Sequence, residues 1–599
     1  MTPTAEPSSL PAFIAECLSL PRAVALAERR GRTEHALSSG AVHRRAAAVA
    51  AALRARRIAR GDRVAILAEN RVDWLVADYG ILYAGATVVP MFATLAQDQI
   101  AYILRDSQSK LVFAGSPTAA AHVRALPDAP HVVEFDAVGD DGLDAFVRSG
   151  TAAQDADSDA LMRVWSEIAR DDLAVLIYTS GTTGTPKGVM LSHGNLLADV
   201  RNAFDPQDSA LRPDDVALSV LPFAHVYEHT DALGYLYNHV THYVTVPDRL
   251  IDDLRAVRPT YAAFVPRIFE RLLAAIVGNA AKAGGLQARL VPWALETGTA
   301  YERARREGGL TPLLQLQFAL ARSLVLRKIA PRLGLDRIRC VVSGSAPLHR
   351  DTAYALAGIG IEVFEGYGLT ETSPVVTVNR PGDNVLGTVG APIRGVEVRI
   401  ADDGEIQVRG PNVMLGYYNV PPDEQPFTPD GWFCTGDIGA FRGTHLTITD
   451  RKRELFKTSG GKWISPARIE SAIKRSVYIG QVVAYGEGRA HPAALVAPNW
   501  MLLRHELGIA DDTPTATMAA DPRVERCVLA EVEAQTRDLA PFEQVHRVAI
   551  LPRDLTIEDG ELSPTLKIKR RVVEQRYAAL AASAYDSFPV GRTAARTSS

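Results

Sequence analysis

The chain has 599 residues, of which 47% are hydrophobic and 22% charged, as is usual for a globular protein. Lys plus Arg (65) nearly balance Asp plus Glu (69), and the net charge of -4 lacks the excess of basic residues that is typical of a nucleic-acid-binding protein. Four widely spaced cysteines, no signal peptide and no apolar run of about 18 residues indicate a cytoplasmic protein without a spanning helix.

Apolar strands alternate with helices from residue 63 onward. Strands are predicted over 63–67, 87–91 and 110–114, with helices over 72–86 and 95–107 between them. Such alternation is typical of βαβ units and a parallel sheet. A further buried strand is expected over 173–178, followed by a polar loop and a helix that begins near His193.

The second half of the chain changes character twice. Residues 267–335 are rich in Leu, Ala and Arg and are predicted to be helical, and 386–449 carry short alternating strands that favour a small β-barrel. We therefore expect an α/β fold with a large N-terminal domain (1–450) of two α/β subdomains with parallel-type sheets plus the barrel. A small mobile α+β domain (451–583) and a disordered tail (584–599) are expected to follow it.

The segment Pro312–Ala330 is predicted to form an amphipathic helix. Leu313, Leu316, Leu320 and Leu324 recur at three- and four-residue spacing, and basic residues accompany them. Such a helix can rest on a membrane surface as a peripheral contact. The commoner arrangement is that the leucines are buried against the protein.

The stretch "YTSGTTGTPKG" (Tyr178–Gly188) has the composition of a phosphate-binding loop, because glycines, hydroxyls and one lysine supply donors to phosphate oxygens. Its spacing differs from the Walker A loop, since Pro186 stands where glycine is required and Gly188 where Ser or Thr is required. These departures argue against a P-loop NTPase. A polar turn between a strand and a helix is the other interpretation.

Five further stretches become informative when they are taken together and in order. They are "SGSAPL" (343–348), "EGYGLTETSP" (365–374), "GWFCTGDIG" (431–439), "DRKRELFKTSGGKWISPARIE" (450–470) and "GELSPTLKIKRR" (560–571). Each alone is compatible with ordinary turns and a solvated basic run. Together with the Tyr178–Gly188 loop they resemble the adenylate-forming superfamily of acyl-CoA synthetases, adenylation domains and beetle luciferases, from about residue 35 to 580.

The resemblance implies that a carboxylic acid attacks the α-phosphate of ATP, that pyrophosphate leaves, and that a thiol, usually that of coenzyme A, displaces AMP from the acyl-AMP. It implies that Thr179, Ser180, Gly181, Thr182, Thr183, Gly184 and Lys187 hold the departing phosphates, and that Thr179 and Glu371 hold Mg²⁺. It further assigns nucleotide contacts to Ser345, Glu365, Gly366, Tyr367, Gly368, Thr370, Asp437 and Arg451.

The C-terminal motifs carry the remaining implied roles. Lys567 matches the lysine that neutralises charge where carboxylate and α-phosphate meet, with Lys569 as the second candidate. Arg453 lies at the family's hinge, where Asp or Lys is usual. Residues Lys457, Gly461 and Trp463 belong to the loop that faces the nucleotide or coenzyme A.

The segment "LPFAHVYEH" contains two histidines four residues apart. The H-E-x-x-H spacing of a zinc site is not met, because Glu228 does not directly follow His225. The resemblance instead places His225 at the acyl and nucleotide pocket, and a structural histidine is the alternative.

This segment, "FVPRIFERL" (264–272), the helical insert after it and "PTLKIKRR" most resemble bacterial long-chain fatty acyl-CoA synthetases. The expected partners are therefore small molecules: a fatty acid, ATP and coenzyme A. The alternatives are a fatty acyl-AMP ligase that delivers to a carrier protein, a CoA ligase for another acid, and a nucleotide-binding scaffold without turnover. The last should lack Lys187, Glu371, Asp437 or Lys567, and all four are present.

Overall fold

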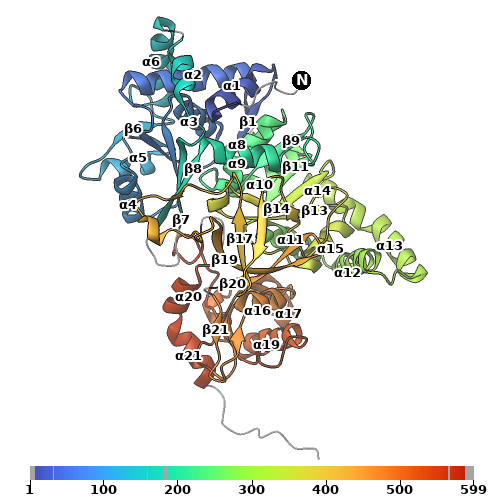
Figure 1. Cartoon of the computed structure of the whole chain (residues 1–599). Coiled ribbons are helices and arrows are strands. Elements are labelled where there is room, and N and C mark those ends of the chain that lie inside the picture. The colour runs from blue at the N-terminus through green and yellow to red at the C-terminus, as the bar shows by residue number, and fades with distance from the viewer. Residues whose placement is uncertain are drawn as a thin grey trace, which may run out of the picture. The chain divides into compact units, whose positions relative to one another are not determined.

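The computed structural model describes residues 7–31, 33–157, 159–179, 186–452, 454–563 and 567–586. Its contacts divide the chain into two compact units (Figure 1). The N-terminal unit comprises Met1–Thr435 and Gly439–Ile448, and the C-terminal unit comprises Gly436–Ile438 and Thr449–Ser599. The predicted domain boundary, between residues 450 and 451, lies close to Thr449, where the longer segment of the C-terminal unit begins.

A seven-stranded sheet contains the strands predicted near the N-terminus. Its order is β18-β8-β7-β4-β3-β5-β6, and the neighbours from β7 to β6 are parallel. Residues 64–67 and 88–91 are buried throughout, which is why they are continuously apolar. The strands are β3 (Arg63–Leu67), β4 (Thr87–Met91), β5 (Leu111–Ala114), β6 (His131–Glu134), β7 (Leu173–Thr179), β8 (Lys187–Ser192) and β18 (Gly416–Tyr417).

A nine-stranded sheet forms the second α/β part of the N-terminal unit. Its order is β15-β14-β13-β12-β11-β9-β10-β1-β2, with a parallel centre from β13 to β1 and antiparallel strands at both ends. The strands are β1 (Leu26–Arg30), β2 (Thr33–Leu37), β9 (Val216–Ser219), β10 (Thr241–Val244), β11 (Tyr261–Phe264), β12 (Cys340–Ser343), β13 (Val363–Gly368), β14 (Val375–Val378) and β15 (Ala391–Pro392).

Helices accompany these sheets in the N-terminal unit, and every residue of α3 is buried. They are α1 (Leu10–Ser19), α2 (Ser39–Ala55), α3 (Val72–Tyr83), α4 (Gln97–Ser107), α5 (Pro117–Arg124), α6 (Leu143–Ala156), α7 (Ala160–Glu167), α8 (His193–Ala203), α9 (Val226–Tyr237), η1 (Pro247–Arg249), α10 (Leu250–Val257), α11 (Pro266–Ala283), α12 (Gly285–Glu307), α13 (Pro312–Leu324), η2 (Leu326–Lys328), α14 (Ile329–Leu333), α15 (Arg350–Gly358), η3 (Thr370–Thr372) and η4 (Pro422–Glu424).

The region predicted as a small barrel is a four-stranded sheet with the order β16-β17-β19-β20. Its strands are β16 (Glu397–Ile400), β17 (Glu405–Arg409), β19 (Phe433–Arg442) and β20 (His445–Arg451). The division between the units falls within β19 and β20, so that Asp437 and Arg451 belong to the C-terminal unit.

The C-terminal unit is built on the three-stranded sheet β23-β24-β25 and a separate pair, β21-β22. The helix α21 continues through residues 584–586, so the predicted tail begins in a helix, and its remaining residues lie outside the described part. The elements are β21 (Phe456–Lys457), β22 (Trp463–Ile464), α16 (Pro466–Ile473), β23 (Ile479–Tyr485), β24 (Ala493–Pro498), α17 (Trp500–Leu507), α18 (Thr515–Ala519), α19 (Pro522–Thr536), β25 (Val548–Ile550), α20 (Arg570–Arg576) and α21 (Ala578–Asp586).

The leucine-rich segment is shorter as a helix than expected, since α13 ends at Leu324 and η2 and α14 follow. The expectation that its leucines are buried is wrong, because Leu313, Leu316, Leu320 and Leu324 are all exposed. Among the residues that the structure describes, none of the helices is both long and apolar enough to pass through a bilayer.

Candidate active site

The phosphate-loop motif joins two antiparallel strands. Strand β8 follows the loop and pairs with β7, and Thr179 lies directly opposite Lys187. Lys187 therefore begins a strand, whereas the sequence analysis expected a loop leading to the helix at His193. Between them, residues 180–185 lie outside the described part of the chain, and with them the predicted contacts of Ser180, Gly181, Thr182, Thr183 and Gly184.

Tyr417 connects two predicted site residues that are far apart in the sequence. Its hydroxyl donates a hydrogen bond to Glu371 Oε1 at 2.7 Å, and its ring centroid lies 5.0 Å from Lys187 Nζ. The position of the ring follows from strand pairing, because β18 aligns Tyr417 with Val189 of β8. A cation over an aromatic face is electrostatically favourable, so one tyrosine holds both Lys187 and Glu371.

Thr179, Lys187, Glu371 and Tyr417 thus form a cluster at the end of β7 and β8, which we call the Tyr417 cluster. The sequence analysis missed Tyr417. The available signal was the aromatic pair Tyr417-Tyr418 in a segment predicted as barrel.

The Tyr417 cluster has the ligand chemistry of a magnesium site. A carboxylate and a hydroxyl are hard oxygen donors, and magnesium commonly takes only one or two protein carboxylates together with phosphate oxygens. Glu371 and Thr179 supply these two donor types. The described residues include no group of three or more His, Cys, Asp or Glu side chains arranged to hold a metal ion.

The segments after β12 and β13 carry the predicted adenine and α-phosphate residues. Ser345 is exposed and has φ 68°, in the left-handed region that few non-glycine residues adopt. Glu365 is buried and accepts a hydrogen bond from Leu348 N at 3.3 Å, which ties the two motifs together. Burial raises the pKa of Glu365 to about 7.

The "EGYG" motif ends β13 at a close backbone contact. An added Cβ at Gly368 would lie 1.6 Å from Pro374 O, so glycine is required there. Gly366 and Gly368 are half-buried while Tyr367 is buried, and Thr370 begins η3 beside Glu371. The motif therefore delivers Thr370 and Glu371 from the end of a strand.

His225 and His229 have different partners. His225 caps α9, where its Nδ1 accepts a hydrogen bond from Tyr227 N at 3.1 Å, and burial lowers its pKa to about 4. His229 is buried with Nε2 3.1 Å from Asp78 Oδ2. At neutral pH His225 is thus an uncharged imidazole.

Asp437 and Arg451 face each other in the C-terminal unit. The carboxylate of Asp437 is buried, and Arg451 Nε donates to its Oδ1 at 2.9 Å. A carboxylate has several acceptor sites, so it can accept from more than one donor.

Lys457, Gly461 and Trp463 lie on the hairpin formed by β21 and β22. Lys457 is aligned with Trp463, and its Nζ lies 4.7 Å from the indole ring. Gly461 has φ 75° in the turn, and Trp463 is 58% exposed. The hairpin therefore presents an exposed aromatic surface and a cation. Arg453, the predicted hinge residue, lies outside the described residues.

Two hydrogen bonds join Lys567 to Ser563, on the other side of residues 564–566, which lie outside the described part. Ser563 N donates to Lys567 O at 2.7 Å, Lys567 N donates to Ser563 Oγ at 3.0 Å, and Lys569 N donates to Glu561 O at 2.8 Å. The Lys567 side chain is exposed, and Lys569 caps α20. Of the two candidate lysines, Lys567 is the one at the exposed end of the loop.

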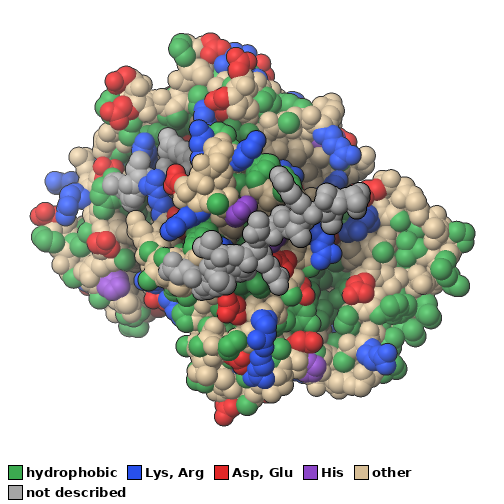
Figure 2. All heavy atoms as spheres, turned by 90° about the horizontal axis from the view of Figure 1, so that it is seen from below, with side chains coloured by type: hydrophobic (Ala, Val, Ile, Leu, Met, Phe, Trp, Pro, Cys, Tyr) green, Lys and Arg blue, Asp and Glu red, His purple; other side chains and the backbone are tan. Residues whose placement is uncertain are grey.

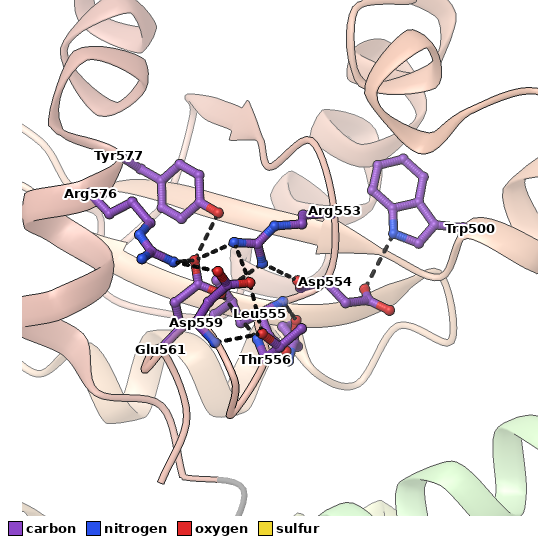
Figure 3. Close-up of polar contacts among 10 residues, drawn as sticks. Trp500, Arg553, Asp554, Leu555, Thr556, Asp559, Glu561, Arg576 and Tyr577 are labelled. Atoms are coloured by element: carbon purple, nitrogen blue, oxygen red, sulfur yellow. Dashed lines mark hydrogen bonds and ion pairs between the residues drawn. The ribbon is translucent and has the colours of Figure 1, made fainter. Parts of the chain in front are cut away.

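The base of this loop is anchored by Glu561, a residue that the sequence analysis did not single out. Its carboxylate is fully buried and accepts hydrogen bonds from Arg553, Arg576, the Tyr577 hydroxyl and Thr556 N (Figure 3). Burial alone would raise the pKa of Glu561, but the hydrogen bonds from Arg553 and Arg576 lower it to about 2. We call these contacts the Glu561 anchor.

Comparison with known proteins matches two family models over most of the chain. A family model described as AMP-binding enzyme matches residues 15–418, and one described as AMP-binding enzyme C-terminal domain matches residues 454–589. The chain is 34% identical over 531 residues to the long-chain-fatty-acid–CoA ligase FadD15 of Mycobacterium bovis, covering 86% of this chain and 87% of that protein. It is 30% identical over 553 residues to human long-chain-fatty-acid–CoA ligase 1, covering 85% of this chain and 76% of the relative.

Solved structures support the same fold. The adenylation domain of a carboxylic acid reductase from Segniliparus rugosus, in complex with AMP and a carboxylic acid, superposes with a TM-score of 0.73 at 22% identity, covering 97% of this chain and 95% of that one. The anthranilate CoA ligase AuaEII in complex with anthranoyl-AMP has a TM-score of 0.72 at 18% identity, covering 97% and 99%.

Proposed function

Because the chain belongs to the AMP-binding enzyme family, we propose that it is a long-chain fatty acid–CoA ligase that forms acyl-CoA, AMP and pyrophosphate. The observation that carries the proposal is the Tyr417 cluster, in which a hydroxyl, a cation and a carboxylate meet at the end of two strands. Its relatives at 34% and 30% identity are named as ligases of this kind.

In the first step a carboxylate oxygen of the fatty acid attacks the α-phosphorus of ATP, and the bond to pyrophosphate breaks. Lys187 neutralises the departing phosphates, and Glu371 with Thr179 would hold Mg²⁺. When bound, that ion supplies further neutralisation of phosphate charge. The chain contributes mainly position and charge, which are the chief means of catalysing phosphoryl-group reactions.

The proposal assigns the nucleotide contacts to residues from several motifs of the chain. In this proposal Ser345, Glu365, Gly366, Tyr367 and Gly368 surround the adenine, with Thr370 at the α-phosphate. Asp437 accepts hydrogen bonds from the ribose hydroxyls beside Arg451. Lys567 stabilises the charge where the carboxylate meets the α-phosphate.

In the second step the sulfur of coenzyme A attacks the acyl carbonyl carbon, and AMP leaves with the oxygen that the fatty acid supplied. The hairpin with Lys457, Gly461 and Trp463 faces the nucleotide or coenzyme A, and the chain pivots at Arg453. The proposal thus assigns residues 1–450 to nucleotide and acyl binding and residues 451–583 to a mobile lid.

The acid is proposed to be a long-chain fatty acid, with His225 beside its pocket as an uncharged imidazole. A long acyl chain needs an apolar environment, since each buried methylene contributes about 0.8 kcal/mol. The proposal also places the protein in the cytoplasm, where its free cysteines fit a reducing compartment, and at the inner face of the membrane as a peripheral contact.

The test is a panel of acetate, octanoate, palmitate, longer fatty acids and an aromatic acid, assayed for AMP release with and without coenzyme A. The proposal requires turnover of the long-chain acids that depends on ATP, magnesium and coenzyme A. Release of ADP, or a strong preference for acetate or the aromatic acid, would contradict it. Turnover with a carrier protein but not with coenzyme A would identify an acyl-AMP ligase.

A further inference from the structure

Helix α13 exposes a stripe of leucines. Leu313, Leu316, Leu320 and Leu324 are 65%, 69%, 51% and 44% exposed, and their spacing places them on one side of the helix. Single exposed leucines are ordinary on protein surfaces, but a contiguous apolar stripe marks a contact site. We call this stripe the α13 leucine face.

The helix does not need its leucine face for its own packing. α13 packs beside α12, where the ring of Phe318 stacks on Tyr301 with 3.9 Å between centroids, and Ala321 is buried. Thr311 caps the helix by accepting a hydrogen bond from Leu314 N at 3.2 Å. In Figure 2 hydrophobic side chains gather over the lobe formed by α12 and α13, at the right of the view.

The surroundings of the leucine face are positively charged. Residues 308–335 contain no Asp or Glu, although the whole chain has a net charge of -4. The four basic residues of this segment are Arg322, Arg327, Lys328 and Arg332, and all are exposed. An apolar face accompanied by cations is the combination by which surface helices bind anionic lipid headgroups.

A second copy of the chain fits this surface less well. A two-fold interface through α13 would bring the same cations of both copies together, because such an interface uses one patch twice. An anionic membrane instead attracts the cations while its acyl region receives the leucines.

We propose that the α13 leucine face docks the enzyme on an anionic membrane surface. The inference rests on the proposed peripheral contact and names the surface that makes it, which gives the enzyme access to acids that partition into lipid. Arg327 and Lys328, in η2 just after the helix, then lie at the level of the headgroups.

The test is co-sedimentation of the full chain with vesicles of phosphatidylglycerol and phosphatidylcholine. The double variant Leu316→Glu/Leu320→Glu should lower the partition coefficient at least about tenfold, since each leucine lost from an apolar environment weakens binding by that order. The control is Val138→Glu/Met162→Glu, which adds the same charge at two other exposed apolar residues and should bind as the original protein does.

The proposal is wrong if the original chain does not bind these vesicles, or if the leucine variant binds them equally well. It is also wrong if light scattering shows that the original chain is a dimer and the leucine variant is a monomer. Turnover of octanoate in solution separates this inference from the proposed reaction. The rate of octanoate turnover should be the same in both variants as in the original protein. Loss of vesicle binding with unchanged octanoate turnover therefore supports membrane docking and leaves the proposed reaction unaffected.

Discussion

The two units hold their predicted reactive lysines by different means. Lys187 is the first residue of β8, fixed by strand pairing and by the ring of Tyr417. Lys567 is at the exposed end of a loop whose base is fixed by the buried carboxylate of Glu561. In the proposed reaction both lysines act in the first step, Lys187 from the edge of a sheet and Lys567 from an anchored loop.

Removing the Glu561 anchor is the strongest test of the difference between the two units. Glu561→Gln removes the buried carboxylate that accepts hydrogen bonds from Arg553 and Arg576, and losing charge-assisted hydrogen bonds of this kind costs about 1.5–3 kcal/mol. We expect this loss in urea unfolding of the C-terminal unit. The control Glu558→Gln, an exposed neighbour, should have little effect.

The pH dependence of stability provides a second readout for Glu561. Because the folded-state pKa of Glu561 is about 2, below its ordinary value of 4.5, its stabilisation is present above pH 4.5 and is lost as the pH falls toward 2. The Gln variant should lack this part of the acid dependence. Unchanged stability and an unchanged acid profile would show that the anchor is dispensable.

Lys567→Ala tests whether the anchored lysine acts in one step only. Removing one charge-stabilising donor should slow acyl-AMP formation by about 10²–10³, while thioester formation from supplied acyl-AMP continues. Both half-reactions are measured separately in rapid-quench experiments, with Lys569→Ala as the comparison. Equal losses in both steps, or a larger loss with Lys569→Ala, would contradict the assignment of Lys567.

Asp437→Ala tests the nucleotide contact of the C-terminal unit. Charge-assisted hydrogen bonds to two ribose hydroxyls contribute roughly 1.5–3 kcal/mol each, so calorimetry should show ATP affinity reduced at least about tenfold. The matched control is Asp430→Ala, whose carboxylate pairs with Arg399 on the surface. Unchanged affinity in a folded Asp437 variant would make Asp437 a structural residue.

Tyr417→Phe has the smallest expected effect and tests the hydrogen bond between Tyr417 and Glu371 in the N-terminal unit. The ring beneath Lys187 remains, but the hydrogen bond to Glu371 is lost, which should weaken magnesium-dependent ATP turnover by about tenfold. Increased magnesium should restore part of the rate if the hydroxyl positions Glu371. Tyr418→Phe is the control, and an equal effect there would show that packing, not the hydrogen bond, is responsible.

Much of the fold could be predicted because its strands are buried on both faces. Residues 64–67 and 88–91 are continuously apolar for that reason, and they lie in strands in the structure. Strand β8 was missed because its short sequence, "KGVMLS", follows a glycine-rich loop and directly precedes a capped helix.

Contacts between distant segments could not be predicted in this way. Tyr417 and Glu561 owe their importance to partners brought near by the fold, and the only local signal is the aromatic pair at Tyr417. The leucines of α13 illustrate a related limit. Their spacing predicted one apolar side of a helix, but it could not show that Phe318 and Ala321 face the protein instead.

The central claim, that the fatty acid passes through acyl-AMP, is tested most directly by following its oxygen. Palmitate labelled with a heavy oxygen isotope in its carboxylate is turned over with ATP and coenzyme A, and the nucleotide is analysed by mass spectrometry. The account predicts one labelled oxygen in each AMP, because the attacking carboxylate oxygen leaves with the α-phosphorus. Unlabelled AMP, or label in inorganic phosphate alongside ADP, would contradict it.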